Sequence, residues 1–336
     1  MTLLLDDRLK EWAGANDLRR AVAATISSLA RASSDLAGLI AKAPLLGDLA
    51  VIVGGNAGGD AQKELDVRAD ALFRAALRDA PVAELVSEEA DDIVHLNASA
   101  PLSVAIDPLD GSSNIETNVA IGTIFGIWPK AGRLQPGDAQ LASGFVVYGP
   151  QTMLVLTLRD GVEIYVLDPD ARHFVRIREK VAVRPERAEY AINASNYRHW
   201  DRWLQRYVDD CQAGIEGALQ TDYNTRWIAS LVAEAFRILA RGGIFLYPGD
   251  ARQGYAQGRL RLLYEAAPLA LIFEEAGGAA TDGDRRILEK EPDSPHQRTP
   301  LIIGSRDHVD RLGDYRRAAN HGRPSPLFAQ RGLYHR

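Results

Sequence analysis

The sequence of 336 residues predicts an α/β protein, built either as two packed domains or as one large unit. Its hydrophobic fraction of 46% and its charged fraction of 25% are those of an ordinary globular protein. Segments with helical spacing of apolar residues alternate with short apolar runs, and residues 121–180 are rich in strand patterns. Composition and rhythm change near residue 185, so we divide the chain into an N-terminal domain (1–184) and a C-terminal domain (185–336).

The N-terminal part is expected to open with two helices, followed by two strands. Residues 18–40 keep one apolar stripe at helical spacing, and a second helix begins near Asp66. The glycine-rich segment 54–60 between them predicts a mobile loop. Two apolar runs, 82–89 and 102–107, then predict short strands that each end in acidic residues.

Four further strands are expected to pair antiparallel, because turn signals such as Gly149-Pro150 and Asp160-Gly161 separate them. They are TIFGIW (123–128), GFVVYG (144–149), TMLVLTL (152–158) and VEIYVLD (162–168).

The C-terminal part mixes helices and strands. The expected elements, in order, are a helix over 226–240 closed by Gly242-Gly243, a strand over 243–248, a helix over 260–278 stopped by two glycines, strands over 278–282 and 299–305, and a last helix capped by Ser305.

Composition excludes several classes of protein. The net charge is -6 and no basic stripe carries interleaved aromatic residues, so a nucleic-acid partner is not expected. The single cysteine, Cys211, rules out an intramolecular disulfide and cysteine-based metal motifs. No apolar run approaches the roughly 18 residues of a membrane span, and the N-terminus lacks the basic and apolar regions of a signal peptide. We therefore expect a cytoplasmic protein without a membrane partner.

The stretch AIDPLDGSSNIE (105–116) is the first candidate site. Asp107 ends an apolar strand, and Pro108 forces a turn because it removes a ladder N–H group. The turn lets the carboxylates of Asp107 and Asp110 converge with the Leu109 carbonyl, a set of hard oxygen ligands that suits Mg²⁺ or Mn²⁺.

The residues that follow add the elements of a phosphate site. The N–H groups of Gly111, Ser112 and Ser113 form an anion cradle if a helical turn starts there. A cation site beside a phosphate site makes sense if a metal ion bridges protein carboxylates and a phosphate.

Each acidic segment taken singly has a simpler interpretation. The dipeptides DP and DG are ordinary turn signals, and the pair Glu88-Glu89 at a strand end is usually just solvated. Asp60 and Asp66 flank AQKEL and alone would be a surface acid and a helix cap. The presence of all these segments in one chain favours a functional site over separate surface turns and caps.

Together these segments resemble class I fructose-1,6-bisphosphatase, of the metal-dependent sugar phosphatase superfamily, over nearly the whole chain. The resemblance implies the α/β sugar phosphatase fold, an αβαβα layering of two mixed sheets with helices between and outside them. The matching segments are GDAQKELD (59–66), SEE (87–89), IDPLDGSSNI (106–115), GTIFGIW (122–128), GGIFLYP (242–248), LRLLYEAAP (260–268) and the tail SPLFAQRGLYHR (325–336).

The resemblance also implies roles for individual residues. Carboxylates expected to bind metal are Glu88, Asp107, Asp110 and Glu265, with the Leu109 carbonyl as a backbone ligand. Acids associated with activating the attacking water are Glu89 and Asp66, and Asp60 is a loop acid that reaches the metals when the loop closes.

Substrate contacts follow from the same resemblance. Gly111, Ser112 and Ser113 match the cradle of the 1-phosphate, with Arg261 beside it. Residues matching contacts to the 6-phosphate are Asn193, Arg226 and Tyr247, and Arg259 stands where the family usually has a lysine. Because the family counterpart of Arg226 completes a neighbour's site, we expect a homo-oligomer, namely a tetramer.

The implied reaction is hydrolysis of D-fructose 1,6-bisphosphate to fructose 6-phosphate with Mg²⁺, for which Mn²⁺ is a substitute, in gluconeogenesis or the reductive pentose phosphate cycle. Three alternatives stay open: a second activity on sedoheptulose 1,7-bisphosphate, an inositol-monophosphatase-like enzyme, and a non-catalytic sugar-phosphate sensor.

The chain departs from the family pattern in three places. Trp227 stands where a tyrosine often follows the arginine, and the loop between Tyr247 and Arg259 is slightly long. Positions that match the family's AMP site carry uncharged residues, namely Pro101, Leu102 and Pro129, so inhibition by AMP is expected to be weak.

Overall fold

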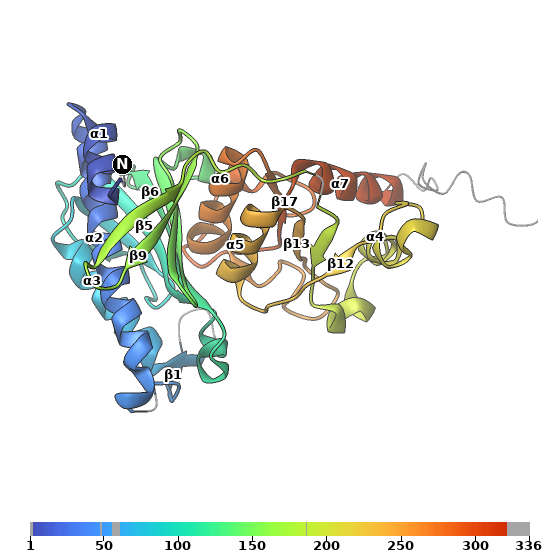
Figure 1. Ribbon diagram of the computed structural model, residues 1–336, viewed down its shortest axis with the longest axis horizontal. Helices are drawn as coiled ribbons and strands as arrows, with labels where there is room; N and C mark the ends of the chain where they lie inside the picture. Colours follow the sequence, from blue (N-terminus) through green and yellow to red (C-terminus); the bar gives the residue numbers. More distant parts are fainter. Residues whose placement is uncertain (1–2, 48, 56–60, 186, 321–336) are drawn as a thin grey trace, which may run out of the picture.

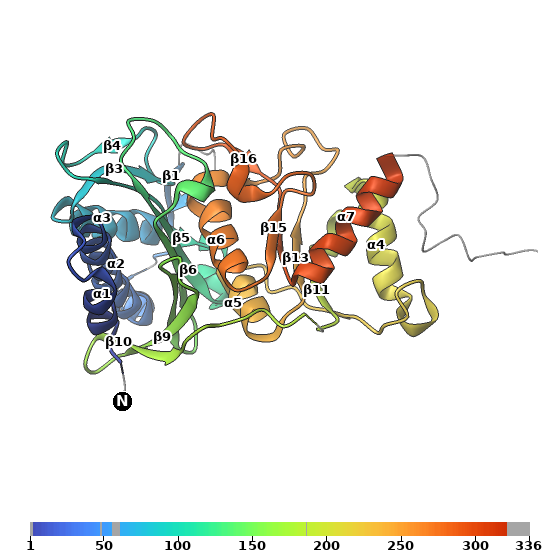
Figure 2. The same ribbon diagram turned by 90° about the horizontal axis from the view of Figure 1, so that it is seen from above.

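The computed structural model describes residues 3–47, 49–55, 61–185 and 187–320. Within them the elements form five layers, in the order helices, sheet, helices, sheet, helices (Figure 1). The view from above shows the same order from α1 to α4 and α7 (Figure 2). The predicted αβαβα layering with two mixed sheets is confirmed.

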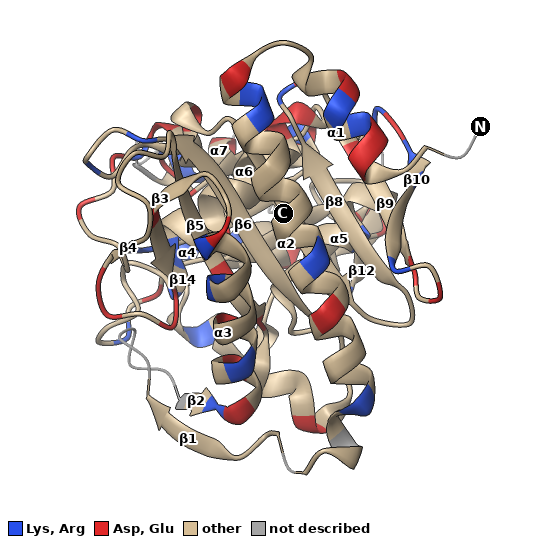
Figure 3. Cartoon of the chain, turned by 90° about the vertical axis from the view of Figure 1, so that its left-hand side faces the viewer, with Lys and Arg blue, Asp and Glu red and all other residues tan. Residues whose placement is uncertain are grey.

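The first layer consists of α1 (Leu5–Ala13), α2 (Asp17–Lys42) and α3 (Glu64–Arg78). They pack against the first sheet through one large apolar cluster, which includes Leu9, Ile26 and Phe73. The outer faces of these helices carry charges of both signs, interspersed along each helix (Figure 3). The predicted helices at 18–40 and near Asp66 correspond to α2 and α3, whereas α1 was not expected.

The first sheet has eight strands in the order β10-β9-β8-β7-β6-β5-β3-β4. Only β3 and β5 run parallel, and the other neighbours are antiparallel. The antiparallel pairing predicted from the turn signals is confirmed for β6 to β9. The strands are β3 (Val82–Ser87), β4 (Val94–His95), β5 (Leu102–Asp110), β6 (Ile121–Pro129), β7 (Ala142–Tyr148), β8 (Thr152–Thr157), β9 (Val162–Asp168) and β10 (His173–Arg178).

Strand β5 does not end at Asp107, as the sequence predicts, but continues to Asp110. The pairing with β6 shifts between these two residues, because Asp107 lies opposite Ile124 and Asp110 lies opposite Gly122. In a regular strand residues three apart point to opposite faces, whereas an extra residue re-aims the side chains that follow it. The irregularity also accommodates Pro108, which has no N–H group to offer the ladder.

The middle layer consists of α5 (Leu231–Arg241) and α6 (Ala267–Glu275). The helix predicted over 226–240 begins only at Leu231, because Ser230 is extended and its hydroxyl accepts the N–H of Ala233 as an N-cap.

The helix predicted over 260–278 is divided in three. It contains β14 (Leu260–Arg261), a π-helical turn (Leu262–Ala266) and α6. The N–H of Ala267 donates to the carbonyl of Leu262, five residues back, which defines the wide turn.

The second sheet has five strands in the order β12-β11-β13-β17-β15 and is covered by α4 (Arg202–Gln212) and α7 (Arg306–Asn320). It is mixed, since β11 is parallel to both β12 and β13 while the other pairs are antiparallel. The strands are β11 (Glu189–Ala191), β12 (Asn224–Thr225), β13 (Ile244–Tyr247), β15 (Ala279–Thr281) and β17 (Leu301–Gly304).

The hydroxyl of Ser305, expected to cap the last helix, has other partners. It donates to the Arg184 carbonyl at 2.7 Å and accepts the N–H of Gly243 at 3.2 Å. Only the backbone carbonyl of Ser305 takes part in the first turn of α7. The side chain therefore ties the segment before the second sheet to β13.

Two small two-stranded sheets complete the described chain. One is the antiparallel pair of β1 (Ile52–Gly55) and β2 (Ala61–Lys63). The other is not a hairpin, because in it β14 pairs with the distant β16 (Arg298–Thr299). The first includes two glycines of the predicted loop at 54–60, and the rest of that loop lies outside the described residues. No described helix has the length and apolarity needed to cross a membrane.

Candidate active site

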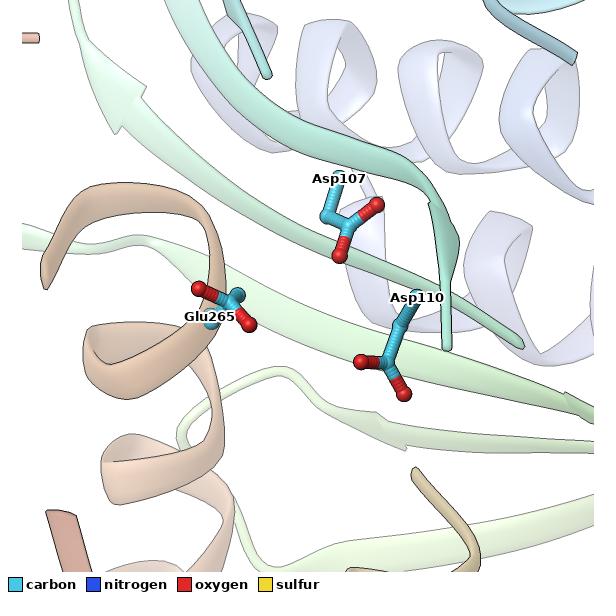
Figure 4. Close-up of side chains that lie close together, drawn as sticks. All are labelled: Asp107, Asp110 and Glu265. Atoms are coloured by element: carbon cyan, nitrogen blue, oxygen red, sulfur yellow. The ribbon is translucent and has the colours of Figure 1, made fainter. Parts of the chain in front are cut away.

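Three carboxylates from two elements meet between the first sheet and the middle layer. Asp107 and Asp110 come from the irregular end of β5, and Glu265 comes from the π-helical turn (Figure 4). Each offers one oxygen, and these oxygens lie within 4.8 Å of one another. All three residues are buried, with 2%, 7% and 7% of their surface exposed. The sequence predicted this convergence, although it placed the end of the strand at Asp107 rather than at Asp110.

Burial and mutual repulsion dominate the electrostatics of the cluster. Burial first, and then the neighbouring carboxylates of Glu88 and Asp110, raise the pKa of Asp107 well above its usual range. The pKa of Glu265 is raised well above its usual range by burial and by Glu88. Burial also raises the pKa of Asp110 to about 6. Glu88 therefore lies beside Asp107 in the same acidic centre, and its role as a metal ligand, which the resemblance implies, stays a prediction.

Backbone N–H groups hold the three carboxylates in place. Asp110 Oδ2 accepts the N–H of Val232 at 3.0 Å, at the start of α5, where the helix dipole favours a negative charge. Asp107 Oδ1 accepts the N–H of Leu109 at 2.9 Å, and Glu265 Oε2 accepts the N–H of Arg261. These donors do not neutralise four acids. The crowded all-oxygen set is what a hard divalent cation requires.

A second acidic group lies next to the first. Glu89 Oε2 accepts a hydrogen bond from Gln62 Nε2 at 2.5 Å, and Asp66 Oδ2 accepts the N–H of Lys63 at 2.7 Å. Burial, followed by the charge of Glu88, raises the pKa of Glu89 to about 7. Burial raises the pKa of Asp66 to about 6, and its Oδ1 is buried without a hydrogen-bond partner among the described residues.

Asp70 belongs to this second group and was not singled out from the sequence. It lies one helical turn after Asp66 on α3, so both face the sheet. Its Oδ1 accepts the Ser87 hydroxyl at 2.6 Å, and that hydroxyl in turn accepts the N–H of Glu89 at 3.3 Å. The spacing of four residues between two acids at the start of a helix was the available signal.

The predicted phosphate cradle directly follows Asp110. Gly111 adopts a left-handed conformation with φ of 81°, which glycine tolerates without strain. A 3-10 turn, Ser112–Thr117, starts there. The Asn114 amide donates to the Ala229 carbonyl at 2.8 Å, which ties this turn to the segment before α5.

Arg261 lies against the acidic centre, and its predicted contact with the 1-phosphate stays a prediction. It is among the largest fully buried side chains, with 2% of its surface exposed. Its charge lowers the pKa of Glu265 against the larger effect of burial, which places the guanidinium near that carboxylate. A cation is therefore available beside the carboxylates.

A pocket of about 170 Å³ adjoins this centre on the side of the second sheet. Three of the predicted substrate residues line it, namely Asn193, Tyr247 and Arg259. Polar and aromatic residues that the sequence did not single out complete the wall: Asn196, Trp200, Asp250, Arg252 and Tyr255. Tyr247 connects the two regions, because its pKa is raised mainly by burial and also responds to the charges of Glu265 on one side and Arg259 on the other.

One predicted substrate residue lies elsewhere. Arg226 is not among the residues described as lining the pocket; its half-exposed guanidinium lies with Nε 3.5 Å from Glu189 Oε1. Three further arginines surround the same buried carboxylate: Arg187, Arg237 and Arg241. Asp60 lies outside the described residues. The carbonyl of Leu109 sits in the irregular end of β5, between the two aspartates.

The departures from the family pattern also have defined positions. The Trp227 ring stacks on the Phe245 ring, with ring centroids 6.0 Å apart, and also on the neighbouring Tyr247 ring. Leu102 and Pro129 are cross-strand partners of β5 and β6, so the predicted uncharged patch is contiguous.

Two family models match the chain in succession. The N-terminal domain of fructose-1-6-bisphosphatase matches residues 5–179, and the C-terminal domain of fructose-1-6-bisphosphatase matches residues 183–317. A class 1 fructose-1,6-bisphosphatase from Azorhizobium caulinodans is 53% identical over 318 residues, which cover 91% of this chain and 97% of that protein. A class 1 fructose-1,6-bisphosphatase from Methylorubrum extorquens is 51% identical and covers 98% of this chain and 97% of that protein.

Solved structures give the same picture. Fructose-1,6-bisphosphatase from Leishmania major in its holo form superposes with a TM-score of 0.88 at 34% identity, over 94% of this chain and 99% of that one. The T-state of the same enzyme superposes with a TM-score of 0.84 at 32% identity, over 94% of this chain and 99% of that one.

Proposed function

The chain belongs to the class 1 fructose-1,6-bisphosphatase family, and on that premise we propose that it hydrolyses D-fructose 1,6-bisphosphate to fructose 6-phosphate and inorganic phosphate. One observation carries the proposal. Asp107, Asp110 and Glu265 offer oxygens within 4.8 Å of one another, and an arginine-lined pocket adjoins them. A bisphosphate suits this pairing of an acidic centre with a cationic pocket.

The acidic centre fits Mg²⁺, and Mn²⁺ is a substitute with the same ligand preference. The residues that would hold the cation are Glu88, Asp107, Asp110, Glu265 and the carbonyl of Leu109. When bound, such a cation offsets their charge and draws negative charge from phosphate oxygens in an in-line displacement. The raised pKa values of the carboxylates support this assignment, because burial first, and then the neighbouring carboxylates, disfavour their charged forms, and a bound cation would favour them.

Glu89 is the base that takes a proton from the attacking water in this proposal. Its pKa of about 7 suits a group that must accept a proton near neutral pH. Gln62 donates to Oε2 and so orients the carboxylate, which leaves Oε1 for the water. Asp66, and Asp60 in the segment outside the described residues, are the further acids that assist this step.

The two phosphates are assigned to opposite ends of the site. The N–H groups of Gly111, Ser112 and Ser113, with Arg261, receive the 1-phosphate. The 6-phosphate enters the adjoining pocket, where Asn193, Tyr247 and Arg259 line the wall. Phosphoryl transfer depends mainly on such positioning and on charge stabilisation.

We also propose a homotetramer in the cytoplasm. Arg226 supports the proposed assembly. Its side chain is half exposed and is not among the residues described as lining the pocket of its own chain, so it could reach the pocket of a neighbouring subunit. Exposed apolar residues in the 3-10 turn after α2 and around the start of β1 offer a contact surface: Leu45, Leu46, Val51, Ile52 and Val53. Light scattering at assay concentration tests the assembly, and a fully active monomer would overturn it.

Phosphate release from fructose 1,6-bisphosphate, with added Mg²⁺ and with excess chelator, tests the activity and the cofactor together. We expect turnover with Mg²⁺ and nearly none with chelator. Absence of release under both conditions would overturn the activity, and equal release under both would overturn the metal dependence. Sedoheptulose 1,7-bisphosphate in the same assay measures the substrate preference, which stays open.

A further inference from the structure

The loop between β13 and β14, residues 248–259, supplies four residues to the wall of the pocket described above, namely Asp250, Arg252, Tyr255 and Arg259. This is the loop that the sequence shows to be slightly long. The family resemblance implies a role in substrate binding for Arg259, but not for Asp250, Arg252 or Tyr255.

The loop is a built structure, held at several points by its own backbone. The N–H of Asp250 donates to the Tyr255 carbonyl, the N–H of Tyr255 donates to the Arg252 carbonyl, and the N–H of Ala251 donates to the His199 carbonyl. A Cβ added at Gly249 would lie 2.4 Å from the Ala256 carbonyl oxygen. These contacts fix the backbone on both sides of Arg252.

Arg252 is held by a carboxylate and an aromatic ring. Its Nε donates to both carboxylate oxygens of Asp250, at 2.9 and 3.1 Å, and its Nη2 donates to the same group. The guanidinium carbon lies 4.1 Å from the centre of the Tyr255 ring. Among the described residues Nη1 has no hydrogen-bond partner, and about a third of the side chain is exposed. Donors are therefore left for a ligand in the pocket.

Arg259 approaches the same ring, with its guanidinium carbon 5.2 Å from the ring centre and Nη1 3.3 Å from the Tyr255 hydroxyl. The pocket wall thus contains two arginines and one carboxylate, Asp250, as its charged groups among the lining residues described. The balance is one positive charge. Planar guanidinium groups bind the oxygens of a phosphate in pairs, whereas sugar hydroxyls do not require two cations.

We propose that Arg252, held by Asp250 and stacked on Tyr255, is a further binding residue for the distal phosphate and sets the preference of the enzyme for bisphosphorylated over monophosphorylated sugars. This inference rests on the proposed function. The ion pair between Arg252 and Asp250 is partly exposed, and such pairs contribute little to stability. If Arg252 had only a structural role, a substitution that removes its charge would therefore leave ligand binding almost unchanged.

The direct test is the affinity for fructose 6-phosphate, which carries only the distal phosphate, measured by isothermal titration calorimetry without added metal. We expect Arg252→Gln to weaken binding at least tenfold and Arg252→Lys to restore part of the loss. The matched control is Arg133→Gln, whose guanidinium is 70% exposed and 3.9 Å from Glu291, and which should bind within twofold of wild type. Circular dichroism and thermal melting check that each variant is folded.

A second measurement separates this inference from the proposed function. We expect Arg252→Gln to lower the ratio of kcat/KM values for fructose 1,6-bisphosphate and fructose 1-phosphate at least tenfold. If wild type hydrolyses the bisphosphate but the folded variant keeps both this ratio and the fructose 6-phosphate affinity within twofold, only the role of Arg252 is overturned. If wild type binds fructose 6-phosphate through Arg252 but releases no phosphate, the binding role stands and the proposed reaction fails.

Discussion

Asp110 takes part in two structures at once. It is a member of the acidic centre, and its Oδ2 accepts the N–H of Val232 at the start of α5. Asparagine keeps an acceptor oxygen for that N–H group but removes the charge that a divalent cation needs. The two tasks can therefore be separated by one substitution.

We expect Asp110→Asn to lower kcat by on the order of 10²–10³-fold, as loss of one strong electrostatic contact to a transition state does. Thermal melting in chelator at pH 8 should show a protein at least as stable as wild type, because one repelling charge is gone. The matched control is Asp314→Asn, an exposed acid whose ion-pair partner among the described residues is Arg317, one turn later on α7. Activity of Asp110→Asn within tenfold of wild type would contradict the metal assignment.

The raised pKa of Glu89 predicts how the activity depends on pH. Its pKa of about 7 means that the carboxyl loses its proton near neutral pH in the metal-free protein, and a bound cation would move this loss to lower pH. The rate constant kcat/KM should therefore fall on the acidic side of neutrality in wild type. Glu89→Gln should lower kcat by about 10²–10⁴-fold and flatten this acidic limb. A variant with the same limb as wild type would show that another group takes the proton.

At the scale of elements, the site depends on how closely α5 approaches β6. Gly122 lies opposite Asp110 in the β5–β6 ladder. A Cβ at this position would lie 2.2 Å from the Val146 carbonyl oxygen and 2.6 Å from a Val232 methyl group. Only glycine lets the helix come near enough for its first N–H groups to reach Asp110.

We expect Gly122→Ala to reduce the free energy of unfolding by about 2–4 kcal/mol, through overpacking, as measured by urea denaturation. Gly38→Ala is the matched control. Gly38 lies on α2 with nothing within 4 Å of an added Cβ, so the same change there should be neutral or stabilising by about 0.5–1 kcal/mol. Equal effects of the two substitutions would contradict the close approach of α5.

Much of the element pattern could be predicted from the sequence. Six of the eight strands of the first sheet, β3 and β5 to β9, follow from β-branched runs between clear turns, whereas β4 and β10 were not expected. Helix α2 follows from its apolar stripe. The continuation of β5 past Pro108 could not, because it depends on pairing with β6. The π-helical turn that presents Glu265 is equally a product of tertiary packing, since LLYEA alone has ordinary helical propensity.

The residues of the candidate site also fall into those that the sequence could identify and those that it could not. Residues in short contiguous motifs, such as Asp107 and Asp110, could be found because a turn brings neighbours together. Arg252 and Asp70 could not, because their positions depend on a folded loop and on the packing of α3 against β3. For Arg252 no local pattern distinguishes the residue from a surface charge, and for Asp70 the spacing of four residues from Asp66 is a signal too weak to act on alone.

At the scale of the whole molecule, the acidic centre links stability to pH and metal. The pKa values of Asp66 and Asp110 are raised to about 6 and that of Glu89 to about 7, from ordinary values near 4. Because the folded protein binds these protons more tightly than the unfolded chain, the associated stabilisation is complete below about pH 4. It is lost as the pH rises through 6 to 7, and each tenfold difference in proton affinity between the two states contributes about 1.4 kcal/mol.

A bound cation should restore the stability that is lost at higher pH, because the carboxylates are ionised there. We therefore expect Mg²⁺ to raise the melting temperature more at pH 8 than at pH 5.5, with chelator as the reference at each pH. At pH 5.5 protons compete for the same oxygens. An equal or larger rise at pH 5.5 would mean that the cation binds elsewhere.

The central claim is that the acidic centre receives the 1-phosphate while the adjoining pocket receives the 6-phosphate. Phosphorus-31 NMR of fructose 1,6-bisphosphate turnover with Mg²⁺ tests it directly, because the two monophosphate products have distinct signals. In water enriched in oxygen-18, we predict fructose 6-phosphate with no label at its C1 oxygen, and inorganic phosphate with one oxygen-18 from a water that attacked phosphorus. Accumulation of fructose 1-phosphate, or of a labelled sugar with unlabelled phosphate, would contradict the account.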